Sequence, residues 1–136
     1  MKEEDKDLVV IDLSARLPYG VIVAIKSSNH EDWDDWVGEL TYKDLDFFDN
    51  DVIYDYIKPY LRPMSSMTEE EGKEYHNLCY EEESECYEFG EWTTKIYVHN
   101  TIESIDWLNS IHFDYRGLIE KGLAIEVTEE NNPYKD

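Results

Sequence analysis

The sequence contains few of the residues on which the common motifs of small enzymes depend. Its 136 residues include only 6 glycines, 4 prolines and 2 cysteines. It has no glycine-rich phosphate loop, no Gly-x-Ser-x-Gly motif of the kind found in many hydrolases, and no His-Glu-x-x-His motif of zinc proteases. We therefore expect a protein that is not an enzyme and that holds no cofactor.

Long apolar runs are missing as well. No stretch approaches the roughly 18 consecutive apolar residues that a membrane-spanning helix needs. The charged residues 2–7 are not followed by the apolar run of a secretory signal. We expect a cytoplasmic protein that does not bind a membrane.

Basic residues are scarce, because 12 lysines and arginines stand against 33 aspartates and glutamates, and the formal net charge is -21. Such a charge repels the phosphates of nucleic acids and of anionic lipids, so we expect no direct binding to either. A basic protein surface is the expected partner, although acidity also keeps many proteins soluble. The sequence does not indicate an oligomeric state.

Apolar and aromatic residues are plentiful, at 41% and 14% of the chain, and they are sufficient to fill a hydrophobic core. A length of 136 residues is close to the commonest domain size. We predict a single domain over residues 1–136 with frayed ends at 1–7 and 128–136.

Apolar residues alternate with polar ones over 9–17, a period typical of a half-buried strand. The turn residues 18–20 then lead into a β-rich run at 21–25, so we predict that the two strands pair as an antiparallel hairpin. Further strands are predicted at 36–42, 92–99 and 123–127.

Helix start signals occur where a Ser, Thr or Asn precedes a glutamate by three residues. Ser66 predicts a helix over roughly 68–87, and Asn100 predicts a second helix that ends near His112. The apolar stripe of that second helix would be formed by Ile102, Ile105, Leu108 and Ile111.

Two shorter helices complete the prediction, one near 51–57 and one over 115–121 that Asp114 would cap. Taken together, the elements predict an α+β fold, with a mostly antiparallel sheet of four or five strands packed against two or three helices.

Four stretches of the sequence, 17–21, 58–71, 105–109 and 112–124, resemble an uncharacterised family. Its members are small acidic proteins encoded by gut Bacteroidales bacteria and by their phages and mobile elements. The resemblance implies no catalytic residue, ligand or partner. A phage or mobile-element setting favours a host-directed or regulatory binding role.

The best candidate binding residues are two tryptophans within an acidic stretch. Trp33 and Trp36 offer rigid apolar area, and Asp32, Asp34 and Asp35 add negative charge beside them. This combination suits a groove on a basic partner, whereas a purely structural tryptophan would anchor the sheet. Our main hypothesis is therefore a non-enzymatic protein-interaction domain.

Two alternatives stay open. In the first, carboxylates stand in for phosphates, and the protein inhibits a DNA-binding protein by mimicking nucleic acid. In the second, the chain is a small metal-dependent or hydrolytic enzyme, which would require a concave pocket with converging polar groups.

Neither the acids nor the cysteines indicate a metal site. The five aspartates between positions 44 and 55 lack the glycine and the final glutamate of a calcium loop. Within one helix, Cys79 and Cys86 would lie about 10.5 Å apart along the axis, which exceeds disulfide reach. His76 could meet Cys79 on that helix, but the surrounding glutamates disfavour a thiolate.

Overall fold

The computed structural model describes residues 2–25, 36–41 and 57–135. Within them it contains three α-helices and seven strands, so the predicted α+β class is confirmed. The chain divides into two compact units, residues 1–66 with 109–136 and residues 67–108. Each is described here by itself, and the single domain stays a prediction. No described helix is long and apolar enough to cross a membrane.

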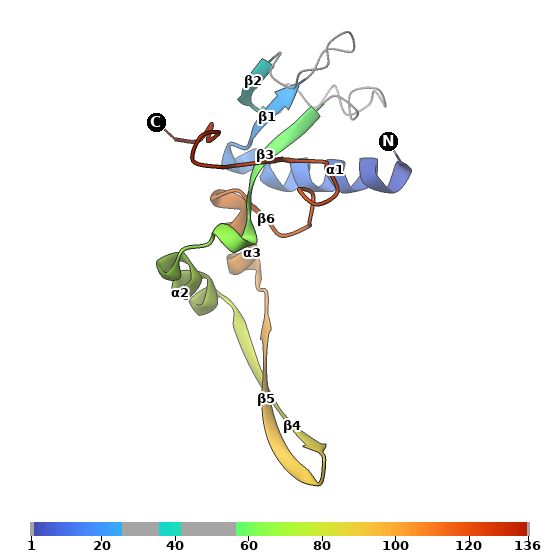
Figure 1. The fold of residues 1–136 in the computed structure, drawn as a ribbon, viewed down its shortest axis with the longest axis vertical. Coiled ribbons are helices and arrows are strands. Elements are labelled where there is room, and N and C mark those ends of the chain that lie inside the picture. Colours follow the sequence, from blue (N-terminus) through green and yellow to red (C-terminus); the bar gives the residue numbers. More distant parts are fainter. Residues whose placement is uncertain (1, 26–35, 42–56, 136) are drawn as a thin grey trace. The chain divides into compact units, whose positions relative to one another are not determined.

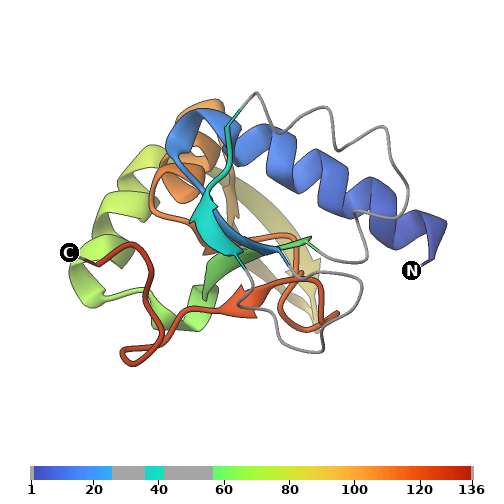
Figure 2. The ribbon, with the colours of Figure 1, turned by 90° about the horizontal axis from the view of Figure 1, so that it is seen from above.

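The first unit is built on a mixed five-stranded sheet (Figure 1, Figure 2). β1 pairs with β2 and with β3 in antiparallel fashion, whereas β6 and β7 run parallel to β3. The strands are β1 (Ile22–Ile25), β2 (Trp36–Glu39), β3 (Ile57–Pro63), β6 (Phe113–Asp114) and β7 (Ile125–Glu126). The predicted strands at 21–25, 36–42 and 123–127 are thus confirmed, the last two in shortened form.

The predicted strand at 9–17 is wrong, because residues 9–16 belong to α1 (Glu3–Arg16) and Leu17 begins a 3-10 turn. Three acids in the first turn and an arginine in the last turn complement the helix dipole. The predicted hairpin between the strands at 9–17 and 21–25 is therefore wrong as well. β1 pairs instead with β2 and β3.

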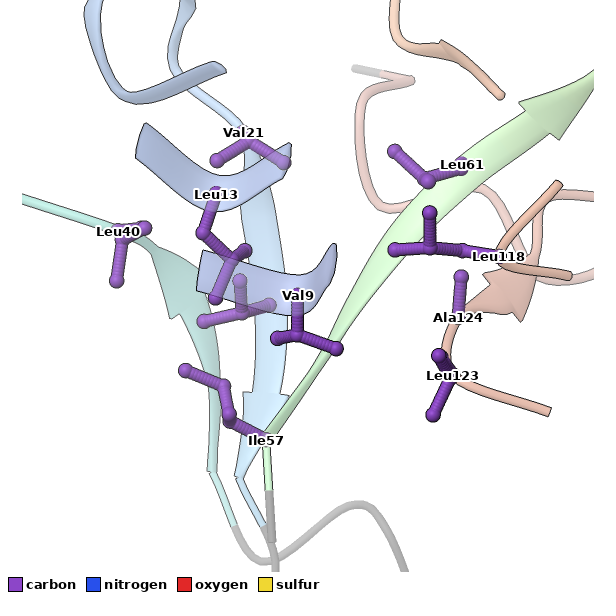
Figure 3. Packing of buried hydrophobic residues seen from close by; sticks show 10 residues of the cluster. Val9, Leu13, Val21, Leu40, Ile57, Leu61, Leu118, Leu123 and Ala124 are labelled. Atoms are coloured by element: carbon purple, nitrogen blue, oxygen red, sulfur yellow. The ribbon is translucent and has the colours of Figure 1, made fainter. Parts of the chain in front are cut away.

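The core of this unit lies between α1 and the sheet (Figure 3). Val9 and Leu13 of α1 pack with Val23 of β1 and with Ile57 and Leu61 of β3. The short 3-10 turn η1 (Leu17–Tyr19) joins α1 to β1. It ends at Gly20, whose φ of 71° is in the left-handed region, where glycine is favoured.

β3 was not predicted as a strand because it contains two prolines. Pro59 pairs opposite Val23 of β1, while β7 and β6 join β3 only from Tyr60 onward. Pro59 therefore lies where β3 has one neighbouring strand, a position at which a sheet tolerates proline. The predicted helix at 51–57 is wrong at Ile57, which begins β3, and its other residues lie outside the described ones.

The second unit begins with α2 (Glu69–Leu78), whose start the sequence locates within a few residues. The capping residue is Thr68, not Ser66: its hydroxyl accepts the amide of Glu71 at 3.1 Å, and the Glu71 carboxylate accepts the amide of Thr68 at 3.0 Å. This reciprocal pair is a capping box.

The predicted helix over 68–87 is wrong beyond Leu78, because the chain continues as a strand. β4 (Tyr80–Glu88) pairs antiparallel with β5 (Glu91–His99), which confirms the strand predicted at 92–99. Phe89 and Gly90 form the turn with φ values of 53° and 81°. Positive φ at both central residues matches the twist of a two-residue hairpin.

α3 (Ile102–Ser110) confirms the second predicted helix, with two corrections. The capping residue is Thr101, whose hydroxyl accepts the Ser104 amide at 3.0 Å. Ile102 does not join the buried stripe, since its side chain is 79% exposed, whereas that of Leu108 is fully buried.

The helix predicted over 115–121 is wrong, because this segment forms turns. Asp114 nevertheless binds backbone amides of this segment, as a capping residue would. Its two carboxylate oxygens accept the amides of Leu118 and Ile119 at 3.0 and 2.9 Å. Gly117 and Gly122 adopt φ values of 77° and 73°, which a right-handed helix cannot contain.

The structure also separates the two cysteines that the sequence places on one helix. Cys79 follows the last residue of α2, and Cys86 lies in β4. A strand rises by about 3.3 Å per residue, so the six steps from Tyr80 to Cys86 span about 20 Å. This distance is far beyond disulfide reach.

We therefore expect two free thiols per chain after denaturation without reductant. A thiol-reactive reagent and intact-mass measurement would check this. A mass lower by two hydrogens, or fewer than two reactive thiols, would contradict the extended course of β4.

Candidate functional site

Most of the binding residues predicted from the sequence lie outside the described residues. This holds for Asp32, Trp33, Asp34 and Asp35, while Trp36 begins β2 opposite Ile25. The site that they would form stays a prediction. The aspartates at 44, 46, 49, 51 and 55 also lie outside, and the described residues hold no group of three potential metal ligands.

The β4–β5 hairpin, drawn as a ribbon in Figure 1, has one face with an unusual composition. Alternate residues of a strand point to the same side, and directly paired residues share a face. We call this side the acidic-aromatic face. It consists of Glu81, Glu83, Glu85 and Tyr87 from β4 with Val98, Ile96, Thr94 and Trp92 opposite them on β5.

Every residue of the acidic-aromatic face is exposed. The side of β5 is largely apolar, with Trp92 71%, Ile96 59% and Val98 50% exposed. The side of β4 is largely acidic, and neither Glu83 nor Glu85 forms a salt bridge within the described part of the chain. An apolar row and an acidic row therefore lie side by side in water.

The free end of the hairpin is aromatic. The Tyr87 and Trp92 rings are tilted by 60° with centroids 5.4 Å apart, and Phe89 in the turn is fully exposed. Aromatic side chains of this kind lose little conformational entropy when they bind, because they have few rotatable bonds.

The opposite face of the hairpin makes its own polar contacts. Lys95 binds Glu88 at 2.6 Å, and the His99 ring lies 3.0 Å from the Glu82 carboxylate and stacks on Tyr80. These two contacts each join a side chain of β4 to a side chain of β5. On the acidic-aromatic face, Glu81 pairs with His76 of α2, whereas Glu83 and Glu85 form no salt bridge with the described residues and can interact with another molecule.

Contacts with the two helices fix the open end of the hairpin. Tyr75 of α2 stacks on Trp107 of α3 at 5.8 Å and donates a hydrogen bond to Asn100, and burial raises the pKa of Tyr75. Thr101 donates to the carbonyl of Leu78 at 2.6 Å. These contacts stabilise a hairpin that would be marginal alone.

The first unit contains a pocket of about 740 Å³, which lies at the end of β3. Three chain segments line it, and they are far apart in the sequence. The lining residues are Arg62, Ser66, Ser110, Ile111, His112, Val127, Thr128, Glu129, Asn132, Tyr134 and Lys135.

His112 and Tyr134 stack against each other in the lining of this pocket. Their rings stack with centroids 3.7 Å apart and an interplanar angle of 9°. The Tyr134 hydroxyl donates to the Tyr60 carbonyl at 2.7 Å and accepts the Ile22 amide at 2.9 Å, and burial raises its pKa. Tyr134 thereby ties the C-terminal segment to β1 and β3, whereas the fraying of residues 128–136 stays a prediction.

Burial lowers the pKa of His112 to about 4, and the nearby Arg16 and Arg62 contribute in the same direction. The ring is therefore neutral at pH 7. Its backbone has a φ of 67°, and its carbonyl accepts the Arg62 amide at 2.8 Å. The Nδ1 atom of the ring is buried and has no hydrogen-bond partner among the described residues.

Neither the acidic-aromatic face nor the pocket at the end of β3 was predicted from the sequence. The alternation of residues 92–99 indicated the apolar side of the hairpin, but the strand that supplies the acids was assigned to a helix. The pocket has no sequence signal, since its parts meet only through the sheet and the C-terminal segment.

The chain matches no protein-family model, no curated protein and no solved structure with which we compared it. Its fold defines an α+β protein with a mixed sheet and a separate two-stranded sheet. Functional conclusions therefore depend on the geometry of the two features above.

Proposed function

We propose that the protein is a non-enzymatic interaction domain and that its acidic-aromatic face binds a basic protein surface. The observation that carries this proposal is the exposed apolar row of β5 beside the acidic row of β4. A contiguous apolar surface in water is typical of an interaction site. A host-directed or regulatory role, which the family resemblance implies, and a cytoplasmic location, which the lack of long apolar runs led us to expect, belong to the same proposal.

The two rows would act at different stages of binding. The acids, together with the net charge of -21, would draw a basic partner toward the protein and orient it. Trp92, Tyr87 and Ile96 would then lose their contact with water, and tryptophan and tyrosine are the residues that most often dominate binding energy. Lysines or arginines flanking an apolar stretch on the partner would match both rows.

The apolar row favours a protein partner over mimicry of nucleic acid. A mimic needs carboxylates where a duplex carries phosphates, whereas half of the acidic-aromatic face holds Trp92, Thr94, Ile96 and Val98. These side chains correspond to nothing on a phosphate backbone.

Substitutions on the face should weaken the binding of a synthetic peptide in which lysine and leucine alternate. We expect Trp92→Ala to raise the Kd at least tenfold, because an aromatic anchor that dominates binding contributes about 2 kcal/mol or more. The double variant Glu83→Gln with Glu85→Gln should also raise it and should reduce the salt dependence of binding. Isothermal titration calorimetry at two salt concentrations measures both effects.

The matched control is Glu70→Gln with Glu74→Gln, which removes the same charge from exposed positions of α2. It should change the Kd less than twofold. If both double variants weaken binding equally, the peptide senses only the net charge. If Trp92→Ala binds as the parent protein does, the acidic-aromatic face is not the binding surface. Far-ultraviolet circular dichroism establishes that each variant is folded.

A further inference from the structure

The pocket of the first unit differs in charge from the rest of the chain. Arg62 and Lys135 line it together with a single acid, Glu129. Acids outnumber bases by 33 to 12 in the whole sequence. A pocket in which bases predominate therefore reverses the general charge of the protein.

We infer that this pocket binds a small molecule that carries an oxyanion, either a carboxylate or a phosphate group. Its volume of about 740 Å³ is within the range of known ligand pockets. Arginine and lysine are the side chains that bind both groups, and arginine can present two parallel N–H donors to them. The inference does not depend on the function proposed for the hairpin.

Arg62 is held in place at the pocket. Its guanidinium lies over the Phe113 ring, 4.2 Å from the centroid, and donates to the Ser66 carbonyl at 3.3 Å. Its own backbone amide is fixed by the His112 carbonyl. A cation fixed in this way has little conformational freedom to lose when a ligand binds, which favours affinity.

The remaining lining fits a small polar molecule. The hydroxyl of Thr128 and the side-chain amide of Asn132 offer hydrogen-bond donors. The His112 ring carries no charge at pH 7, but a neutral imidazole still provides one N–H. Ile111 and Val127 add apolar lining for the body of the ligand.

Glu129 limits the charge of the ligand. Its carboxylate would repel a second negative charge, and it could pair with an amine on the same molecule. A singly charged oxyanion, or one that also carries an ammonium group, should bind better than a dianion.

Benzoate and methyl phenyl phosphate are suitable probes, since each carries one ring and one negative charge and they differ in the oxyanion, and benzyl alcohol is their neutral counterpart. Amide chemical shifts of the full-length protein at pH 7 would be followed by NMR during titration with each probe. We expect the two anions to shift the amides of His112, Thr128 and Asn132, and the alcohol not to. The anion that binds more tightly identifies the carboxylate or the phosphate class.

Lys135→Gln should weaken anion binding about threefold or more, and Arg62→Gln about tenfold. The control is Lys121→Gln, which removes the same charge from an exposed position of the same unit that does not line the pocket. Its affinity should equal that of the parent protein.

Failure of both anions to shift these amides at millimolar concentration would overturn the inference. Equal losses in Lys135→Gln and Lys121→Gln would do the same, because the effect would then be one of net charge alone. Arg62 also contacts Phe113 and Ser66, so Arg62→Gln could disturb folding. If that variant does not fold, the affinity of Lys135→Gln for the anions is the test of the inference.

Discussion

Replacing Asp12 with asparagine is expected to lower the free energy of unfolding by about 3 to 5 kcal/mol. The Asp12 carboxylate is fully buried, and it accepts hydrogen bonds from Arg16 at 2.8 Å and from Arg116 at 2.9 Å. Asparagine has nearly the same shape but no charge. The variant would therefore leave the Arg16 guanidinium in the core without a counter-charge at its Nε.

Arg16 has little to replace that contact. Its side chain is fully buried, its Nη2 donates to the Phe113 carbonyl at 2.5 Å, and its Nη1 has no hydrogen-bond partner among the described residues. Asp7→Asn is the control, since Asp7 is an exposed acid of the same helix. Chemical denaturation should show a change of less than about 0.5 kcal/mol for the control. A loss below about 1 kcal/mol in Asp12→Asn would mean that Arg16 finds another partner.

The same ion pair explains why a strand was predicted where α1 lies. The buried face of α1 consists of Val9, Asp12, Leu13 and Arg16, a helical spacing of three and four residues. Two of these are charged, so the face does not look apolar, while the exposed Ile11 completes a false alternation with Val9 and Leu13. Periodicity fails where a core position is occupied by a buried charge that has a partner.

The hairpin shows a different limit of sequence reasoning. The alternation in β5 was sufficient to predict that strand, but β4 is rich in glutamate, which favours helices. Its conformation is determined by its ladder with β5, and a pairing partner does not appear in local composition. The acidic-aromatic face could therefore be found only once the register was known.

The net charge was the main basis of the functional hypothesis drawn from the sequence. The structure shows where the charged side chains that could bind a partner lie. Glu83 and Glu85 of β4 form no salt bridge with the described residues and lie beside apolar side chains of β5, an arrangement that suits a partner with both basic and apolar groups. Positive charge lies at the pocket of the other unit, where it suits a small anion. Neither arrangement can be obtained from the net charge of -21 alone.

Replacing Leu108 with alanine should lower the free energy of unfolding by about 2 to 5 kcal/mol. Leu108 lies in α3 and its side chain is fully buried, so alanine would remove buried methyl groups and leave a cavity that neighbouring side chains fill only in part. In a domain whose total stability is typically about 5 to 15 kcal/mol, such a loss could unfold a measurable fraction of the molecules. Urea denaturation followed by circular dichroism would measure it.

Ile102→Ala is the matched control for this variant, because it also shortens an aliphatic side chain of α3. The Ile102 side chain is 79% exposed, so its loss removes little buried surface and should change the free energy of unfolding by less than about 0.5 kcal/mol. Equal losses in the two variants would show that α3 is rotated from the position described here. Unchanged denaturation of Leu108→Ala would place the stripe of α3 in water, where it would become a candidate interaction surface in competition with the hairpin.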